Sequence, residues 1–376
     1  MRIGIDARFF GPRVGGGGIG RYVEELVTNL QELDHQNEYV LFLKRENFHA
    51  CRIVNSRFRK EMVDVHWYGA KEQLVLPRHI ARARLDFMHF PHWNVPILSR
   101  TPFLATIHDL IMLRQKKSAR VSTRGPIVHG IKHLGYRLAL EHAVHRSRHL
   151  ISVSQYTKDS ILKHFRVSDK KVSVVHNGVK APSDGKGVDL SSLGVYSPYF
   201  LYVGNAYPHK NLEMLLHTFS RFAEERPFVQ LVIAGRRDIF SRNLEREANE
   251  IGLGPERIRF VDLPSDDEIS ALYRACSLFI YPSRDEGFGM PPLEAMLAGA
   301  PVAAAHSASI PEVLKDHAQY FHPDDIEALL RIMHAASVQP DRLRAESEKH
   351  AAFAKRYDWK RCAEETLTIY QNFPLY

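Results

Sequence analysis

The sequence predicts an α/β protein built from two domains, each with a parallel β-sheet covered by helices. Its 376 residues exceed the size of one ordinary domain, which is roughly 150 residues. Short apolar, β-rich runs alternate with helical patterns along the chain, which is typical of βαβ units. Segment 181–198 is rich in Gly, Ser, Pro and Asp and has no hydrophobic period, so we expect it to link the domains.

The candidate strands define the two domains. In the first domain, residues 1–180, they are 2–7, 39–43, 63–67, 86–90, 102–107, 149–154 and 172–176. In the second domain, residues 199–356, they are 199–204, 229–235, 258–261, 278–282 and 301–305. We expect two Rossmann-like domains with a cleft between them, because ligands bind at the carboxyl ends of parallel strands. The last segment, 357–376, spaces its apolar residues by three and four, which predicts an amphipathic helix.

Composition limits the class of protein. Hydrophobic residues make up 44% and charged residues 25% of the chain, which is ordinary for a globular protein. No run approaches ~18 apolar residues, and a strand begins directly after Met1, so we expect neither a transmembrane helix nor a signal peptide. The three cysteines (Cys51, Cys276 and Cys362) lie far apart without zinc spacing, which indicates a reducing cytoplasm.

The net charge of +8 is unevenly distributed. Residues 1–180 contain 30 Lys and Arg against 15 Asp and Glu, whereas residues 181–376 contain 21 against 28. Within 114–148 there are nine basic residues and one acid, and the predicted helix 125–146 mixes apolar with basic residues. This pattern favours an anionic partner, and we expect peripheral attachment to an anionic membrane surface. The alternative is a solubilising surface and a core helix whose basic side faces solvent.

A glycine-rich segment, 11–26, suggests a mobile flap that leads into a helix. Gly15, Gly17 and Gly20 match the GxGxxG pattern of dinucleotide-binding enzymes. However, the preceding strand ends about eight residues too early, and Lys44 follows the second strand where an acid should bind ribose. An NADP-dependent oxidoreductase therefore remains an alternative, as does a flexible surface loop. A basic nucleic-acid-binding protein is a further alternative, although the chain lacks clustered exposed aromatic residues and a recognition helix.

Polar residues follow several predicted strands. His108 and Asp109 come after strand 102–107, where side chains commonly face a ligand. Lys210 stands just before a helix that starts near Asn211, which suits a phosphate held by charge and helix dipole. Arg236 and Arg237 end the next strand. Each of these residues alone could equally be a structural histidine or an exposed cation.

The stretch DEGFGMPPLEAMLAGAPV, 285–302, places Glu286 on a glycine turn and Glu294 in the helix that follows. The glycines allow backbone amides to approach an anion, and an ionised carboxylate accepts hydrogen bonds from sugar hydroxyls. Two such acids beside anion-binding amides describe a nucleotide-sugar site. The alternatives are a solvated turn at Glu286 and stabilisation of the helix dipole by Glu294.

Taken together, these motifs resemble the retaining GT-B glycosyltransferases of the family 4 type, which include sucrose synthase and many bacterial mannosyltransferases. The resemblance runs nearly end to end: it covers GGIGRY, TIHDL, VSQYTKDSI, VVHNGV, VGNAYPHKN, the pair Glu286 and Glu294 eight positions apart, and the Trp359 helix. It is strongest for the polysaccharide and O-antigen mannosyltransferase branch. It implies two Rossmann-like domains facing across a cleft, with a C-terminal helix that returns to the first domain.

The resemblance also implies roles for individual residues. Glu286 would bind donor-sugar hydroxyls, Glu294 the ribose, Lys210 the diphosphate, and His108 the donor sugar. Further donor-binding residues would be Gly18, Gly20, Asn205, Arg236, Arg237, Phe288, Gly289 and Met290. On the acceptor side we expect Gly17, His92 and Asp109. Asn205 stands where the family usually has arginine, so Arg236 or Arg237 would have to supply that charge.

The implied reaction transfers mannose from GDP-mannose, with retention of configuration, to a glycan or polyprenyl-linked glycan in surface polysaccharide synthesis. No D-x-D sequence is present, so no metal site is expected, and no cofactor is expected beyond the donor substrate. The leaving diphosphate would be stabilised by Lys210, arginine and helix dipoles. We expect the enzyme on the cytoplasmic face of the membrane, without a nucleic-acid partner.

Overall fold

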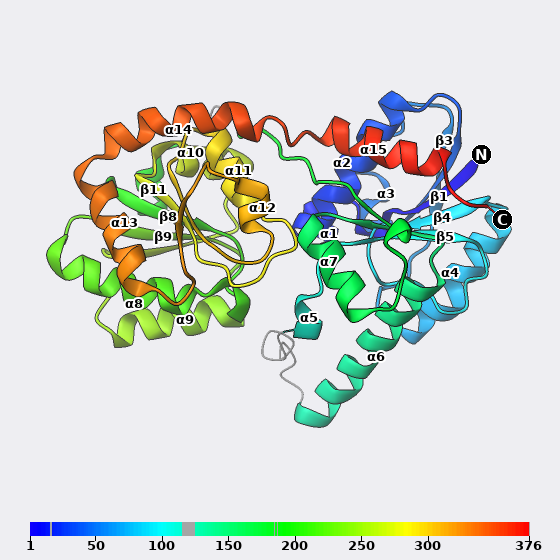
Figure 1. Cartoon of the computed structure of the whole chain (residues 1–376), viewed down its shortest axis with the longest axis horizontal. Helices are drawn as coiled ribbons and strands as arrows, with labels where there is room; N and C mark the ends of the chain where they lie inside the picture. The colour runs from blue at the N-terminus through cyan, green and yellow to red at the C-terminus, as the bar shows by residue number, and fades with distance from the viewer. Residues whose placement is uncertain (16, 115–124, 184, 186, 376) are drawn as a thin grey trace. The chain divides into compact units, whose positions relative to one another are not determined.

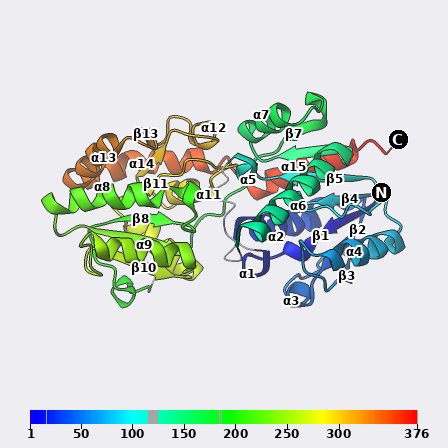
Figure 2. The ribbon, with the colours of Figure 1, turned by 90° about the horizontal axis from the view of Figure 1, so that it is seen from below.

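The computed structural model describes residues 1–376 except 16, 115–124, 184, 186 and 376. The chain forms two compact units: one joins Met1–Gly178 to Tyr357–Tyr376, and the other is Val179–Arg356. Helices flank a central sheet in each unit (Figures 1 and 2). The predicted α/β architecture with two parallel sheets is therefore confirmed.

The first unit contains a parallel seven-stranded sheet in the order β3-β2-β1-β4-β5-β6-β7. Its strands are β1 (Arg2–Asp6), β2 (Glu38–Leu43), β3 (Phe58–Met62), β4 (Phe87–Phe90), β5 (Phe103–Ile107), β6 (His149–Ser152) and β7 (Val172–Val174). Its helices are α1 (Pro12–Gly15), α2 (Gly18–Leu33), α3 (Arg45–Phe48), α4 (Ala70–Ala83), α5 (Ile111–Arg114), α6 (Gly125–Arg146), α7 (Gln155–His164) and α15 (Trp359–Gln371), with short 3-10 turns at Ala7–Phe9 and Asp169–Lys171. Apolar side chains of α4, α6 and α7 bury one face of the sheet.

The C-terminal helix α15 completes the first unit. Asp358 caps its N-terminus by accepting a hydrogen bond from the backbone N–H of Lys360. The helix packs against α2, and the Tyr370 hydroxyl is hydrogen-bonded to His89 Nδ1 on β4 at 2.5 Å. Gly178 lies so close to Trp359 that a side chain there would collide with it. The helix predicted at the end of the chain therefore does contact the first domain.

The second unit contains a parallel six-stranded sheet in the order β10-β9-β8-β11-β12-β13. Its strands are β8 (Tyr199–Val203), β9 (Gln230–Gly235), β10 (Ile258–Asp262), β11 (Leu278–Tyr281), β12 (Val302–Ala305) and β13 (Gln319–Phe321). Its helices are α8 (Leu212–Glu225), α9 (Ile239–Glu250), α10 (Asp266–Ala275), α11 (Met290–Leu297), α12 (Ile310–Leu314), α13 (Ile326–Val338) and α14 (Pro340–Ala354), with 3-10 turns at Leu190–Leu193 and Pro208–Lys210. The segment predicted as a linker, 181–198, falls within this unit.

Two strand assignments differ from the prediction. The predicted strand 63–67 is wrong: the chain pairs with β2 earlier, at Phe58–Met62, and 63–67 forms a loop. The strand β13 was not predicted. Both β3 and β13 are edge strands, and their placement depends on a neighbouring strand more than on their own composition.

The basic stretch 114–148 is only partly described, because residues 115–124 lie outside the described part of the chain. The predicted helix 125–146 is present as α6. Among the described residues, no helix combines the length and the apolar character needed to cross a bilayer.

Candidate functional site

The polar residues predicted in the second domain gather at the carboxyl edge of its sheet. Lys210 follows β8, Arg236 and Arg237 follow β9, and Glu286 follows β11. These three strands are neighbours in the order β9-β8-β11. The carboxyl edge of a parallel sheet is where ligands bind in such folds.

Glu286 and Lys210 form an almost buried ion pair. Lys210 Nζ donates to Glu286 Oε1 at 2.6 Å, and the hydroxyl of Tyr281 donates to the same oxygen at 2.7 Å. Burial by itself raises the pKa of Glu286, but Lys210, His209 and these two hydrogen bonds outweigh it, so the pKa lies below its usual value. Glu286 is therefore an ionised carboxylate whose Oε2 accepts no hydrogen bond from the described residues.

The loops that carry this pair are fastened to each other. The backbone N–H of Arg284 donates to the carbonyl of His209 at 2.8 Å. Asn211, which has a φ of 60°, directly precedes α8 and donates its side-chain amide to the carbonyl of Pro282 at 3.2 Å. The 3-10 turn Pro208–Lys210 thereby holds Lys210 against the loop of Glu286.

The glycine turn leads directly into helix α11. Gly289 has a φ of 91°, a conformation that glycine adopts readily, and it precedes Met290, the first residue of the helix. Phe288 is buried, and Ser309 Oγ donates to the backbone carbonyls of Glu286 and Phe288 at 3.0 and 3.2 Å. The turn is thus fixed in place, with the helix N-terminus beside Glu286, where partial positive charge favours an anion.

Glu294 lies in the helix after the turn, as predicted, and is the fifth residue of α11. It is half-buried, and the hydroxyl of Tyr273 donates to its Oε2 at 3.2 Å. Tyr273, Tyr281 and Ser309 hold the two glutamates and their loop, and none of them was singled out in the sequence. Tyrosines within apolar runs are indistinguishable from ordinary core residues without the fold.

The two arginines after β9 have different surroundings. Arg237 donates to Glu245 at 2.6 Å, and its backbone N–H donates to Asp262. The exposed side chain of Arg236 makes no hydrogen bond or ion pair with the described residues, and both arginines line a small cavity together with Gly204 and Asp262. Asn205, close to this cavity on the β8 loop, accepts a 3.4 Å hydrogen bond from the backbone of Tyr207.

The predicted residues of the first domain lie at the carboxyl edge of the first sheet. His92 follows β4, while His108 and Asp109 follow β5; the rings of the two histidines are 6.4 Å apart. Asp109 Oδ1 accepts a hydrogen bond from the backbone of Ile111 at 2.9 Å. These residues and those of the second unit lie at the edges of two different sheets.

The predicted glycines lie at the start of α2. Gly17 has a φ of 63° and caps the helix, and Gly18 is its first residue. Gly20 is buried against the backbone of Gly11, whose N–H donates to the Gly20 carbonyl at 3.1 Å, and a side chain at Gly20 would collide with Gly11. Gly20 is therefore required for the close packing of this turn, whether or not it binds the donor.

The histidines behind this edge are held neutral. Burial lowers the pKa of His108 to about 4 and that of His89 to about 3, and it also holds the pKa of His92 far below its usual value. His108 Nε2 lies 2.9 Å from the carbonyl oxygen of Pro91, which can only accept, so Nε2 carries the proton. The Nδ1 of His108 is then a hydrogen-bond acceptor.

These depressed pKa values predict acid lability of the first unit. As the pH falls below about 6.5, the unfolded chain binds protons that the folded histidines do not, so the free energy of unfolding decreases through this range. Thermal denaturation between about pH 7.5 and 5 measures this decrease, and His108→Asn should make it shallower. An identical pH dependence in the variant and the wild type would contradict this assignment.

No group of His, Cys, Asp and Glu with the arrangement of a metal site is found within the described part of the chain. The three cysteines are buried and unpaired.

Two family models match the chain, one in each unit. The model described as Glycosyltransferase Family 4 matches residues 16–181, and the model described as Glycosyl transferases group 1 matches residues 193–352. Together they cover both carboxyl edges described above.

Among relatives, the O-antigen chain mannosyltransferase RfbU of Salmonella typhimurium is 28% identical over 78% of this chain and 75% of its own. The O-antigen chain mannosyltransferase B of Escherichia coli is 26% identical over 94% of this chain and 96% of its own.

Solved structures resemble the whole chain in fold. The sucrose-phosphate synthase from Thermosynechococcus elongatus has a TM-score of 0.77 at 16% identity, covering 99% of this chain and 98% of its own. Anabaena HepE, in complex with UDP and glucose, has a TM-score of 0.75 at 17% identity, covering 99% and 100%. At such low sequence identity, the structural similarity shows that these proteins share the fold of this chain and nothing more.

Proposed function

The chain belongs to the glycosyltransferases of the family 4 type, and from this premise we propose that it transfers a sugar from a nucleotide-sugar to a glycan during surface polysaccharide synthesis. The observation that carries the proposal is the ionised Glu286, paired with Lys210 beside the N-terminus of α11. A carboxylate with one unoccupied oxygen suits sugar hydroxyls, and the adjoining cation and helix N-terminus suit a diphosphate.

We propose mannose, carried by GDP, as the transferred sugar. The support is the names of the relatives, because RfbU and mannosyltransferase B are both described as O-antigen chain mannosyltransferases. The acceptor would then be a glycan or a polyprenyl-linked glycan.

The proposed mechanism retains the configuration of the sugar and uses no metal. Lys210 and the N-terminus of α11 would stabilise the charge that develops on the leaving diphosphate, since preorganised donors act most strongly where charge forms. Glu286 Oε2 would accept a hydrogen bond from a donor-sugar hydroxyl, and Glu294 would bind the ribose. His108, neutral and protonated on Nε2, would accept a hydroxyl hydrogen at Nδ1.

Arg236, rather than Arg237, is proposed to replace the arginine that the family has at Asn205. Arg237 is engaged with Glu245, whereas the Arg236 side chain makes no such contact with the described residues. Arg236→Ala should weaken nucleoside diphosphate binding by about 1.5–3 kcal/mol, the usual contribution of a charged hydrogen bond. Isothermal calorimetry measures this loss, with Arg237→Ala as the matched control that should change affinity by less than about 0.5 kcal/mol. Equal losses in both variants would contradict the choice of Arg236.

We further propose that the basic stretch 114–148 attaches the enzyme peripherally to an anionic membrane on the cytoplasmic face. Each basic residue near such a surface contributes about 1 kcal/mol. Sedimentation with anionic vesicles should recover the protein at low salt and lose it at high salt, and neutral vesicles should recover little. Reversal of Arg114, Lys116 and Lys117 to Glu should reduce recovery. Equal recovery with both vesicle types, unaffected by salt, would refute attachment.

A thermal-shift panel tests the proposed function. A true donor stabilises the folded protein by mass action, so GDP-mannose should raise the melting temperature more than other nucleotide-sugars. NADPH and duplex DNA in the same panel test the oxidoreductase and nucleic-acid alternatives, for which neither family model gives support. Stabilisation by NADPH and by no nucleotide-sugar would overturn the proposal.

A further inference from the structure

A band of aromatic side chains crosses the carboxyl edge of the first sheet, and none of the donor-binding roles uses it. The aromatic strip consists of Phe9, Trp67, Tyr68, His92 and Trp93, which follow strands β1, β3 and β4. Phe9 stacks on Trp67 with ring centroids 4.6 Å apart and lies 5.5 Å from His92. Tyr68 stacks on Trp93 at 5.2 Å. These rings form one continuous surface that reaches His108 through His92.

The strip is only partly buried. Phe9 and His92 form its base, Trp67 and Trp93 are half-buried, and the side chain of Tyr68 is 53% exposed. Lys44 Nζ lies over the Trp67 ring, 4.6 Å from its centroid. Large aromatic rings with hydrogen-bonding groups beside them form the kind of surface that binds a small ligand in one orientation.

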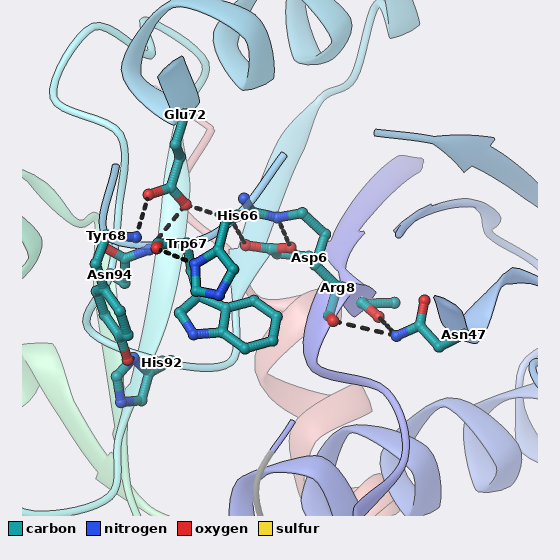
Figure 3. A network of polar contacts seen from close by, with 10 residues as sticks. Asp6, Arg8, Asn47, His66, Trp67, Tyr68, Glu72, His92 and Asn94 are labelled. Carbon is teal, nitrogen blue, oxygen red and sulfur yellow. Dashed lines mark hydrogen bonds and ion pairs between the residues drawn. The ribbon is translucent and has the colours of Figure 1, made fainter. Parts of the chain in front are cut away.

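A buried ionic network lies beside the strip (Figure 3). Arg8 donates through Nε and Nη2 to Asp6 at 2.7 and 2.6 Å, and Nη2 also donates to Glu72 at 2.6 Å. Arg8 and Glu72 are fully buried, and Asp6 is almost so. The third guanidinium nitrogen, Nη1, has no hydrogen-bond partner in the described part of the chain.

This network fixes the loop that carries the exposed rings. Glu72 Oε2 accepts the backbone N–H of Tyr68 at 2.9 Å, and its Oε1 accepts the side-chain amide of Asn94 at 2.8 Å. Tyr68 has a φ of 65°, which is unfavourable for a residue with a bulky side chain. A buried ion pair with an unsatisfied nitrogen stabilises a fold poorly compared with apolar packing. The buried ion pair and the unfavourable φ of Tyr68 therefore need a reason other than stability, and the positioning of Trp67 and Tyr68 provides one.

We propose that the aromatic strip is a sugar-binding platform that holds a hexose ring of the acceptor glycan, with Arg8 and Glu72 as positioning residues. This inference rests on the proposed function, in which the acceptor is a glycan. A sugar ring has an apolar face for stacking and hydroxyls at its rim. The exposed Tyr68 hydroxyl, which lies 3.5 Å from His92 Nδ1, can bind such a hydroxyl.

Tryptophan fluorescence tests the platform directly, without donor. Two of the three tryptophans in the chain, Trp67 and Trp93, belong to the strip, and the third, Trp359, is buried in α15. Titration of the full chain with mannose oligosaccharides should change the emission and saturate. Tyr68→Ala should weaken this binding about tenfold, which is about 1.4 kcal/mol. Tyr196→Ala, which removes an exposed tyrosine of the second unit, is the matched control and should bind as the wild type does.

Kinetics separates this inference from the proposed function. Tyr68→Ala should raise the acceptor KM about tenfold while the thermal shift produced by the nucleotide-sugar remains unchanged. Glu72→Gln should also raise the acceptor KM, and its tryptophan emission without ligand should differ from that of the wild type. A Glu72→Gln variant with a lower melting temperature but a normal acceptor KM would overturn the positioning role.

Several outcomes would overturn the platform itself. These are a wild-type emission that does not respond to oligosaccharides, equal sugar binding by Tyr68→Ala and the wild type, and an emission change caused by neutral lipid vesicles alone. The last would indicate that an apolar partner covers the strip. A lack of stabilisation by every nucleotide-sugar, with sugar binding to the strip intact, would instead refute the proposed donor reaction.

Discussion

Replacement of Glu286 by glutamine is expected to lower the rate of transfer roughly ten- to 150-fold while the protein remains folded. The substitution keeps the shape of the side chain but removes the charge that accepts from Lys210 and Tyr281 and that would accept from the donor sugar. A hydrogen bond to a charged group contributes about 1.5–3 kcal/mol, and each 1.36 kcal/mol is about tenfold in rate. Initial rates at saturating donor and acceptor measure the effect.

Tyr281→Phe is the matched control for this substitution. It removes a neutral donor from the same carboxylate oxygen and leaves the charge in place, so we expect the rate of transfer to fall less than in Glu286→Gln. Thermal denaturation of both variants shows whether the fold is intact. Transfer by Glu286→Gln within twofold of the wild-type rate would remove Glu286 from the proposed mechanism.

Lys210→Ala removes the ammonium group, and we expect it to weaken the binding of the nucleotide-sugar and of the free nucleoside diphosphate by similar amounts, about 1.5–3 kcal/mol each. The similarity follows because the lysine is proposed to contact phosphate, which both ligands contain. Isothermal calorimetry with each ligand measures the two losses. Diphosphate binding as tight as in the wild type would place the phosphate clamp elsewhere.

The same substitution should destabilise the fold, because it leaves the Glu286 carboxylate nearly buried without its cation. Breaking a buried pair from one side costs roughly 3–5 kcal/mol. The double variant Lys210→Ala with Glu286→Gln removes the uncompensated charge and should recover part of the lost stability without recovering diphosphate binding. Recovery of stability without recovery of diphosphate binding would separate the structural role of the ion pair from the proposed role of Lys210 in binding phosphate.

The sequence predicted that the proposed donor residues lie near one another. Glu286, Lys210 and Arg236 each follow a strand, Glu294 lies in the helix after the Glu286 turn, and a parallel sheet brings the ends of its strands to one edge. Their assembly therefore follows from chain order and local pattern. The contact of Lys210 with Glu286, 76 positions away, required the actual loops, which are joined by Arg284 and Asn211.

The edge strand β3 could not be predicted from the sequence alone. Phe58–Met62 contains Arg, Lys and Glu, and the more apolar segment 63–67 was the better candidate by composition. Pairing with β2 decided the outcome, because strand formation at the edge of a sheet depends on the neighbouring strand and the surface it offers.

The sequence by itself determined the fold class, the family and the edge of the second sheet at which the predicted donor residues gather, since periodicity and short motifs are local properties of the chain. Only the tertiary structure joined Arg8 to Glu72 and placed Trp67, Tyr68 and Trp93 in one strip with Phe9. A buried charge is tolerated only with a partner; Arg8 has Asp6 two positions away, but its second carboxylate partner, Glu72, lies 64 positions away in the chain. Contacts at such separation arise from packing, so no local pattern could have indicated them.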